Sequence, residues 1–312
     1  MRPAFARTLL ELAEEDERVW LVVGDVGFGV VEPFVQRFPD RYLNVGVAEA
    51  NLAGVSAGLA LSGAIPFMYS IANFPTLRCL EQIRNDICYN AANVKIVSVG
   101  AGLAYGSLGA THHATEDIAI MRTLPNITVV APADPIETAL ATRAAAEHQG
   151  PVYMRIGRSG DPAVHSSPPT FSLGKALRLR DGLDATIIAS GAITHSALVA
   201  ADQLVGEGMS LRVVSMHTLK PIDRAEIRAA VAETGAVITV EEHSIVGGLG
   251  SAVAFVLAQE GLHPVRFLCL ALPDEFGHRV GGRDHLLASH GLSPQAIASA
   301  VRETVRIRTA TR

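Results

Sequence analysis

Short apolar runs alternate with helix-like periods along the whole chain. Ten runs, rich in Val and Ile, have the length of buried strands. They span residues 19–25, 41–46, 64–70, 94–100, 127–132, 151–156, 185–190, 211–216, 236–242 and 265–272. Helical stretches separate several of them, such as residues 134–148, which open with the helix-start pair Asp134-Pro135. Continuous apolar strands joined by helices predict parallel sheets that are covered by helices on both faces.

One change of composition divides this pattern. Residues 157–175 are rich in Gly, Ser and Pro, which is typical of a linker between domains. The 312 residues are enough for two separate cores. We therefore predict an α/β protein with two doubly wound domains and mostly parallel sheets. The domains cover residues 1–160 and 176–312, and residues 161–175 link them.

Composition and charge narrow the possible partners. Hydrophobic residues make up 49% of the chain and charged residues 18%, as expected for a well-buried folded protein. The net charge of −5 gives no electrostatic footprint for nucleic acid or an anionic membrane. Three cysteines without metal-ligand spacing fit a reducing compartment, and the chain opens with an amphipathic helix rather than a signal peptide. We therefore expect a cytoplasmic protein.

An uncharged stretch at residues 50–77 raises the question of a membrane span. Glycines, prolines and an asparagine divide it into a helix, a turn and a strand. The helix, with roughly 15 residues and about 22 Å of length, is too short to cross a bilayer. Burial in a protein core is the better interpretation.

Four loops follow predicted strands, and ligands of open parallel sheets bind beyond the carboxyl ends of the strands. These loops are residues 24–29, 46–49, 100–113 and 241–250. The glycines of the first are three and then two residues apart, which does not match a dinucleotide fingerprint, and the Walker A lysine is absent. The glycine run at 247–250 could hold an anion at a helix N-terminus or allow close packing of helix on strand.

Glu49 is the only charge at the head of a long apolar helix. An acid in the first turn is favoured by the helix dipole. However, its neighbours are small and apolar, so the carboxylate faces a close-packed surface with little water, where an unpaired charge is costly. No Arg or Lys is near it in the sequence. The predicted partner is therefore a ligand nitrogen.

The loop at 100–113 ends in Thr111-His112-His113 after four glycines that let the backbone approach a ligand. Glu116 and Asp117 nearby suggest a metal site, but adjacent residues project differently and no third ligand has suitable spacing. We predict no metal ligands here, and favour a histidine that handles protons or orients substrate.

Aromatic residues gather after the Glu49 helix. Phe67, Tyr69 and Phe74 lie within residues 65–75. They could belong to the core or form a stacking wall for a flat heteroaromatic ring.

Taken together and in this order, these stretches resemble the carboxyl-terminal half of transketolase, and still more the small subunit of split transketolases. The matching segments are NVGVAEANLAGVSAGLA, YSIANFPTLRCLEQIRND, GSLGATHHATEDIAIMRTLPNITVVAPADP, PVYMRIGR and EEHSIVGGLGSAV. The resemblance spans nearly the whole chain. It implies the pyrimidine-binding domain of a thiamine diphosphate enzyme followed by a transketolase C-terminal-like domain, and hence ketol (two-carbon) transfer.

The resemblance also assigns site residues. Glu49 matches the glutamate that hydrogen-bonds N1′ of the aminopyrimidine ring of thiamine diphosphate, and Phe74 falls where the family stacks an aromatic on that ring. Tyr69 is a second candidate contact with the cofactor. His112 matches the histidine beside the reacting carbons, and Arg158 an arginine that binds the phosphate of the substrate.

Two departures from the family pattern carry further expectations. The G-D-G…N motif that holds the diphosphate and Mg²⁺ is absent. An N-terminal transketolase-like subunit should therefore supply it and hold Mg²⁺, in an α2β2 heterotetramer. Gly100 and Leu108 stand where transketolases carry a histidine and an aspartate that contact the substrate. The sugar or keto substrate is therefore expected to be non-standard.

Other classes remain open at this point. They are the β-subunit of a 2-oxoacid dehydrogenase or decarboxylase, a deoxyxylulose-phosphate-synthase-like enzyme, and a non-catalytic regulatory binding subunit. The ATHHATED run favours transketolase over the dehydrogenase, and a synthase normally has both halves on one chain. The presence of both Glu49 and His112 argues against a regulatory subunit.

Overall fold

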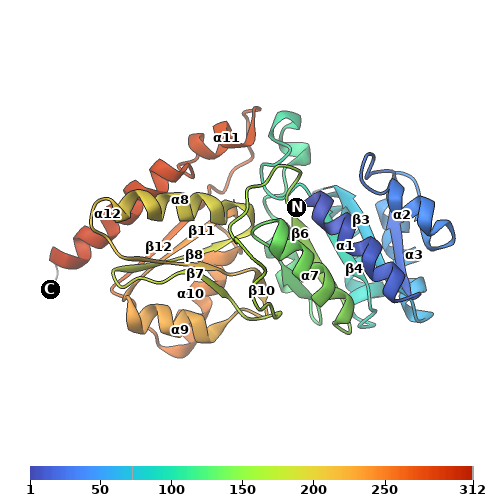
Figure 1. Cartoon of the computed structure of the whole chain (residues 1–312), viewed down its shortest axis with the longest axis horizontal. Coiled ribbons are helices and arrows are strands. Elements are labelled where there is room, and N and C mark those ends of the chain that lie inside the picture. The colour runs from blue at the N-terminus through green and yellow to red at the C-terminus, as the bar shows by residue number, and fades with distance from the viewer. Residues whose placement is uncertain (72, 311–312) are drawn as a thin grey trace.

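The computed structural model describes residues 1–71 and 73–310, which form two α/β units joined end to end (Figure 1). The first unit is built on a seven-stranded sheet of order β10-β5-β6-β4-β3-β1-β2. Its strands are β1 (Val19–Val23), β2 (Tyr42–Asn44), β3 (Ile65–Ile71), β4 (Lys95–Val99), β5 (Thr128–Val130), β6 (Val152–Ile156) and β10 (Thr218–Lys220). All neighbours are parallel except β10 and β5.

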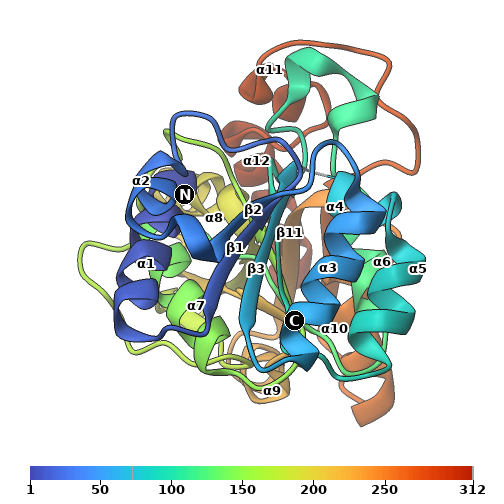
Figure 2. The ribbon, with the colours of Figure 1, turned by 90° about the vertical axis from the view of Figure 1, so that its right-hand side faces the viewer.

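Helices cover both faces of this sheet (Figure 2). One face carries α1 (Arg2–Glu15), α2 (Glu32–Arg37) and α7 (Pro135–Glu147), and the other carries α3 (Glu49–Leu61), α4 (Phe74–Leu77), α5 (Leu80–Gln82) and α6 (Asp117–Thr123). Side chains of β3 alternate between the two faces, as the pleat of a strand requires. Phe67 and Tyr69 join the core under α1 and α7, whereas Met68 joins the core under α3. Both faces are apolar, which explains the continuous apolar run.

The second unit has a five-stranded sheet of order β12-β11-β8-β9-β7, in which only β7 is antiparallel to its neighbour. Its strands are β7 (Leu177–Arg180), β8 (Ala185–Ser190), β9 (Leu211–Ser215), β11 (Ala236–Ser244) and β12 (Arg266–Leu272). Its helices are α8 (Thr194–Val205), α9 (Arg224–Glu233), α10 (Leu249–Glu260), α11 (Arg283–Ser289) and α12 (Pro294–Ala310). Single-turn 3-10 helices lie at Pro39–Arg41, Gly106–Leu108, Ala110–His112 and Gly191–Ile193, and a π-helix at Ile83–Cys88. The predicted fold class is confirmed.

All ten predicted strands are present, but two strands were missed. Both β7 and β10 are antiparallel additions at the edge of a sheet. The β7 segment alternates Leu and Arg and is only half-buried, so it lacks the continuous apolar run of a parallel strand. The β10 segment has three residues, too few for a recognisable period.

The two units share structure across the boundary. The proposed linker, residues 161–175, holds no helix or strand. However, β10 comes from the second half of the chain and pairs with β5 of the first (Figure 1). One apolar cluster also contains Met68 and Ile96 from the first unit and Val214, Leu219 and Val253 from the second. A division at the linker therefore marks a change of sheet and not an independent surface.

A buried carboxylate begins α10. Glu241, near the end of β11, accepts hydrogen bonds from the backbone nitrogens of Leu249 (2.6 Å) and Gly250 (2.8 Å). A Cβ on Gly250 would lie 2.7 Å from Cys269 Sγ, so the glycine also permits close packing of α10 on the sheet. Both interpretations of the glycine run at 247–250 hold, because the anion at the helix N-terminus is the chain's own Glu241.

No helix within residues 1–71 and 73–310 combines the length and the apolar character that a bilayer crossing requires.

Glu241 should make stability depend on pH. Burial raises the pKa of Glu241 from its ordinary value of 4.5 to about 7. The folded chain therefore binds this proton more tightly than the unfolded chain, and the resulting stabilisation is lost as pH rises from about 4.5 through about 7. We expect Glu241→Gln to remove the dependence. The free energy of unfolding of wild type relative to the variant should fall by about 3 kcal/mol between pH 4.5 and 8, measured with urea. A constant difference would contradict this.

Candidate functional site

The carboxyl edge of the first sheet contains a topological switch point. Strand β1 pairs with β2 on one side and β3 on the other, so the loops after these strands open at one place. Glu49 begins α3 after β2, and Phe74 begins α4 after β3. The fold therefore brings two predicted site residues together from segments 25 positions apart.

The loop that leads to Glu49 is fixed by side-chain hydrogen bonds. Asn44 Oδ1 accepts from the backbone nitrogens of Asp25 (3.0 Å) and Gly46 (2.9 Å), and Asn44 Nδ2 donates to Asp25 Oδ1 (3.0 Å). Gly46 has a φ of +76°, which a residue with a side chain rarely adopts. These contacts determine where α3 begins and hence where the Glu49 carboxylate lies.

Glu49 is 4% exposed, as expected from its neighbours, but it already has a partner within the chain. Arg78 Nη1 donates to Glu49 Oε2 at 3.1 Å. The interpretation that no Arg or Lys could pair with Glu49 was therefore wrong. Arg78 is 29 residues away along the chain but follows α4, which packs beside α3 (Figure 2). A signal was present, because Arg78 is the first charged residue after Glu49.

Aromatic contacts extend the site beyond this ion pair. The Arg78 guanidinium carbon lies 3.9 Å from the centroid of the Phe74 ring. The Phe74 ring in turn meets His112 edge-on, with 5.2 Å between centroids and 65° between planes. His112 Nδ1 and Thr111 Oγ1 share a hydrogen bond of 3.0 Å. Phe74 thus connects the buried carboxylate to the predicted substrate-side histidine.

The row continues to Arg158. Tyr105 lies edge-on to His112 at 6.4 Å, and the Arg158 guanidinium carbon lies 4.6 Å from the Tyr105 ring centroid. Arg158 also donates to the carbonyl of Ala104 (3.2 Å) and lines an open cavity of about 480 Å³ with His195. We call the following set the site row: Glu49, Arg78, Phe74, His112, Tyr105 and Arg158. Sequence reasoning missed Arg78 and Tyr105.

Tyr69 does not belong to the site row. Its side chain lies on the face of β3 opposite α3, fully buried, with its ring stacked on Phe5 at 5.6 Å and 10°. Alternation along β3 separates it from Glu49. The structure therefore gives Tyr69 a core position, in place of the predicted second contact with the cofactor.

The loop that carries His112 is closed at its neck and tied to the second unit. Gly102 and Ala114 exchange backbone hydrogen bonds of 3.1 and 3.0 Å. Arg155, fully buried, donates to the carbonyls of Ala114 (2.7 Å) and Glu242 (2.8 Å) and to the Asp117 carboxylate (2.8 Å). The position of His112 therefore depends on contacts made by both units.

Glu242 completes this connection from the side of the second unit. Its carboxylate accepts from the backbone nitrogen of Leu103 (2.7 Å) and pairs with Arg283 (2.5 Å). A Cβ on Gly102 would lie 2.4 Å from Glu242 Cγ. The glycine thus allows the loop to approach the second unit closely.

Gly100 is required by Tyr105. Gly100 has a φ of +98°, and a Cβ there would lie 2.1 Å from Tyr105 Cε2. The Tyr105 ring therefore fills the space that a side chain at position 100 would take. Leu108, the second departure from the transketolase pattern, is exposed on the same loop.

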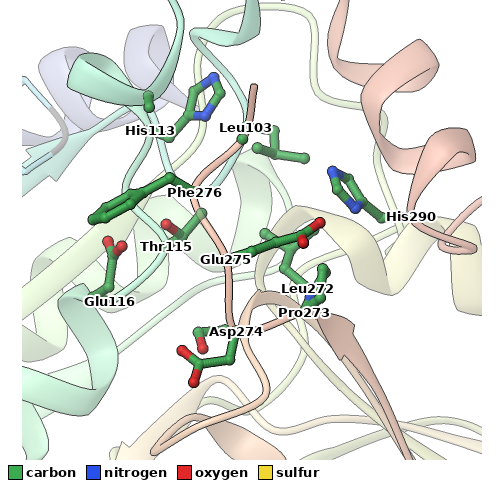
Figure 3. Close-up of a pocket in the computed structure, with 13 residues that line it drawn as sticks. Leu103, His113, Thr115, Glu116, Leu272, Pro273, Asp274, Glu275, Phe276 and His290 are labelled. Atoms are coloured by element: carbon green, nitrogen blue, oxygen red, sulfur yellow. The ribbon is translucent and has the colours of Figure 1, made fainter. Parts of the chain in front are cut away.

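The adjacent histidines face different surroundings. His113 is buried against a cavity of about 170 Å³ between the two units, away from Phe74. Figure 3 shows His113 and Phe276 along one side of this cavity and His290 along the other. Burial lowers the pKa of His113, so the ring is neutral at pH 7. Asp117 is engaged by Tyr153 and Arg155.

A metal site in this loop finds no group of ligands to support it. Residues 1–71 and 73–310 contain no cluster of three His, Cys, Asp or Glu side chains suited to a metal ion.

Comparison with known proteins identifies the family. Residues 1–160 match the family described as "Transketolase, pyrimidine binding domain", and residues 174–297 match "Transketolase, C-terminal domain". A pyrimidine-binding unit followed by this second unit defines a class of thiamine diphosphate enzyme chains. The chain belongs to the transketolase family.

Relatives of similar length are subunits of split enzymes. One of the two subunits of the apulose-4-phosphate transketolase of Phocaeicola vulgatus is 40% identical over 308 residues, covering 98% of this chain and 97% of that protein. The 6-deoxy-6-sulfo-D-fructose transketolase subunit of a Clostridium species is 38% identical, covering 97% and 94%. The solved structure described as "Split gene transketolase, inactive beta4 tetramer" matches with a TM-score of 0.90 and 43% identity, covering 98% of both chains.

These findings confirm the predicted family and enzyme class. The chain is a transferase subunit for thiamine diphosphate-dependent ketol transfer, and it works with a partner subunit. The dehydrogenase β-subunit, the deoxyxylulose-phosphate-synthase-like enzyme and the regulatory subunit are not favoured.

The contact between Gly100 and Tyr105 can be tested with a matched glycine. Gly63 has the same φ of +98° but open space around its Cβ position. We expect Gly63→Ala to cost only backbone strain, about 1 kcal/mol. Gly100→Ala should cost about 1–3 kcal/mol more, because the new methyl group overlaps the Tyr105 ring. Urea unfolding of both variants measures the difference, and equal costs would contradict the assigned contact.

Proposed function

We propose that this chain is the C-terminal subunit of a split transketolase-like enzyme, and that its site row binds the aminopyrimidine ring of thiamine diphosphate and the substrate. The buried Glu49 carboxylate beside the Phe74 ring is the observation that carries this proposal. In this arrangement one planar group can accept a hydrogen bond partner at Glu49 and stack on Phe74 at the same time.

The residues present fit such a ring. The Arg78 guanidinium, a planar group with N–H donors, satisfies Glu49 and covers Phe74, and an aminopyrimidine has the same planarity and a ring nitrogen for the carboxylate. Bound thiamine diphosphate supplies a stabilised carbanion for the transferred two-carbon unit. Glu49 holds a proton at N1′ in a place with little water, and Phe74 fixes the plane of the ring.

The other end of the site row handles the substrate. His112 lies between the Phe74 ring and Tyr105, where its imidazole can orient a substrate oxygen or exchange a proton with it. Arg158 provides a cation at the cavity it shares with His195, suited to the anionic end of a sugar.

The partner is proposed to be an N-terminal transketolase-like subunit that carries the G-D-G…N motif, holds Mg²⁺ and assembles as α2β2. This chain has no such motif. Large apolar side chains near the Glu49 loop are exposed, with Phe28 at 74% and Val47 at 70%, which supports a docking surface there. A solved relative is described as inactive when it forms a tetramer of β chains alone.

The substrate is proposed to be a non-standard anionic sugar or keto compound. Tyr105 occupies the place of a side chain at position 100, and Leu108 offers an apolar group where transketolases carry a carboxylate. Relatives are named for apulose 4-phosphate and 6-deoxy-6-sulfo-D-fructose, which are both anionic. Arg158 would bind the phosphate or sulfonate group.

The proposed location is the cytoplasm. Cys79, Cys88 and Cys269 are all free thiols, and burial raises the pKa of Cys79 to about 12 and of Cys88 to about 11. Buried, unpaired thiols are compatible with a reducing compartment.

Glu49→Gln tests the proposed function. The variant should assemble with the partner, because the charge left behind is the exposed Arg78 and the lost pair is worth about 1 kcal/mol or less. Exchange of the C2 proton of bound thiamine diphosphate, followed by NMR after acid quench, should slow by about 10²–10⁴-fold.

The exposed Glu81 gives the matched control, since Glu81→Gln should exchange like wild type. Light scattering checks assembly, and the isolated chain should show no micromolar binding of cofactor with Mg²⁺. Wild-type exchange in Glu49→Gln would refute the assigned role.

Arg158→Met tests the substrate class. For phosphorylated or sulfonated ketoses the variant should lose about 10–100-fold in kcat/KM, the value of a hydrogen bond to a charged group. Neutral analogues of the same sugars should react as with wild type. Apulose 4-phosphate and 6-deoxy-6-sulfofructose are suitable probes. An equal loss with the neutral analogue would show that Arg158 does not recognise the anion, and rapid turnover of ordinary pentose phosphates would contradict the non-standard substrate.

A further inference from the structure

One guanidinium covers both surfaces that the proposed cofactor needs. Arg78 Nη1 engages Glu49 Oε2 at 3.1 Å, and the same guanidinium lies 3.9 Å from the centroid of Phe74. A ring stacked on Phe74 would require about this same separation, since aromatic atoms in contact lie about 3.5–4 Å apart. The guanidinium and a stacked ring therefore cannot occupy that face of Phe74 together.

The pair is asymmetric in burial. The Glu49 side chain is 3% exposed, whereas the Arg78 side chain is 49% exposed. Without Arg78, the chain would hold a nearly buried carboxylate next to apolar neighbours, and such a charge is costly to leave unpaired. Without Glu49, Arg78 would simply face solvent. The contact therefore matters mainly to the carboxylate.

Arg78 is also free to leave. In the described part of the chain, Glu49 is its one hydrogen-bond partner, and the Phe74 ring is its one aromatic contact. Arg78 stands between the short helices α4 and α5, at the exposed edge of the site. Rotation of its side chain into water would uncover Glu49 and Phe74 and would break only these two contacts.

We propose that Arg78 is a place-holding residue, which keeps Glu49 paired and Phe74 covered until the cofactor ring displaces it. This inference rests on the proposed function. It assigns Arg78 a positioning role, because it holds the carboxylate in place in the free chain. It also implies that the affinity for the cofactor is reduced by the free energy needed to break the Arg78 contacts.

The first test uses the free chain and needs no cofactor. Arg78→Ala should lower the melting temperature by about 2–4 °C, the usual consequence of a modest loss of stability in a chain of this size. Glu49→Gln should lower it less. The double variant should melt above Arg78→Ala, because the unpaired buried charge is gone. A melting temperature equal to the sum of the single effects would overturn the pairing.

The second test uses calorimetry to measure how thiamine diphosphate, with saturating Mg²⁺, binds to this chain in its complex with the partner. Arg78→Ala should bind about 3–30-fold more tightly than wild type, because no internal group has to be displaced. Arg78→Lys, which keeps the charge but lacks the planar stack, should fall between them and serves if the alanine variant does not fold. Arg84→Ala, an exposed arginine on the next turn, is the control and should match wild type.

The outcomes separate the two proposals. Absence of binding in the wild-type complex would refute the proposed function, and this inference with it. Binding by wild type with unchanged or weaker binding by both Arg78 variants would overturn only the place-holding role. Tighter binding by Arg78→Ala, together with a coupled melting cycle, would support it.

Discussion

The buried guanidinium of Arg155 is the contact on which the arrangement of the site depends. It leaves a strand in the middle of the first sheet and reaches the Asp117 carboxylate and two backbone carbonyls, one from each unit. Tyr153, two residues earlier on the same strand, shares Asp117 at 2.5 Å. A charge buried this completely is tolerated only when its donors are matched. The loop with His112 and the second unit are therefore held in register by one side chain.

The strand pattern could be predicted because parallel strands covered on both faces are apolar without interruption. Glu49, Phe74, His112 and Arg158 were all identified from the sequence, and the structure brings them into one row. Tyr69 was misplaced, since the sequence does not tell which face of β3 lies under α3.

Arg78 escaped notice for a related reason. Proximity along the chain is a poor guide to which loops meet at a switch point, and the partner of Glu49 came from the loop after a different strand. The link between Gly100 and Tyr105 was equally hidden, because a missing side chain and the ring that replaces it are five positions apart. In both cases the missing information is a contact between loops.

The exchange of β10 across the boundary has a consequence for biosynthesis. The β5 edge of the first sheet stays unpaired until residues 218–220 have left the ribosome, some 90 positions after β5 itself. An open strand edge is a template for wrong pairing, so the nascent first half is exposed to aggregation during that interval. The gene of such an enzyme can be interrupted ahead of this chain, but a break at residues 161–175 would leave each fragment with an incomplete sheet or an orphan strand.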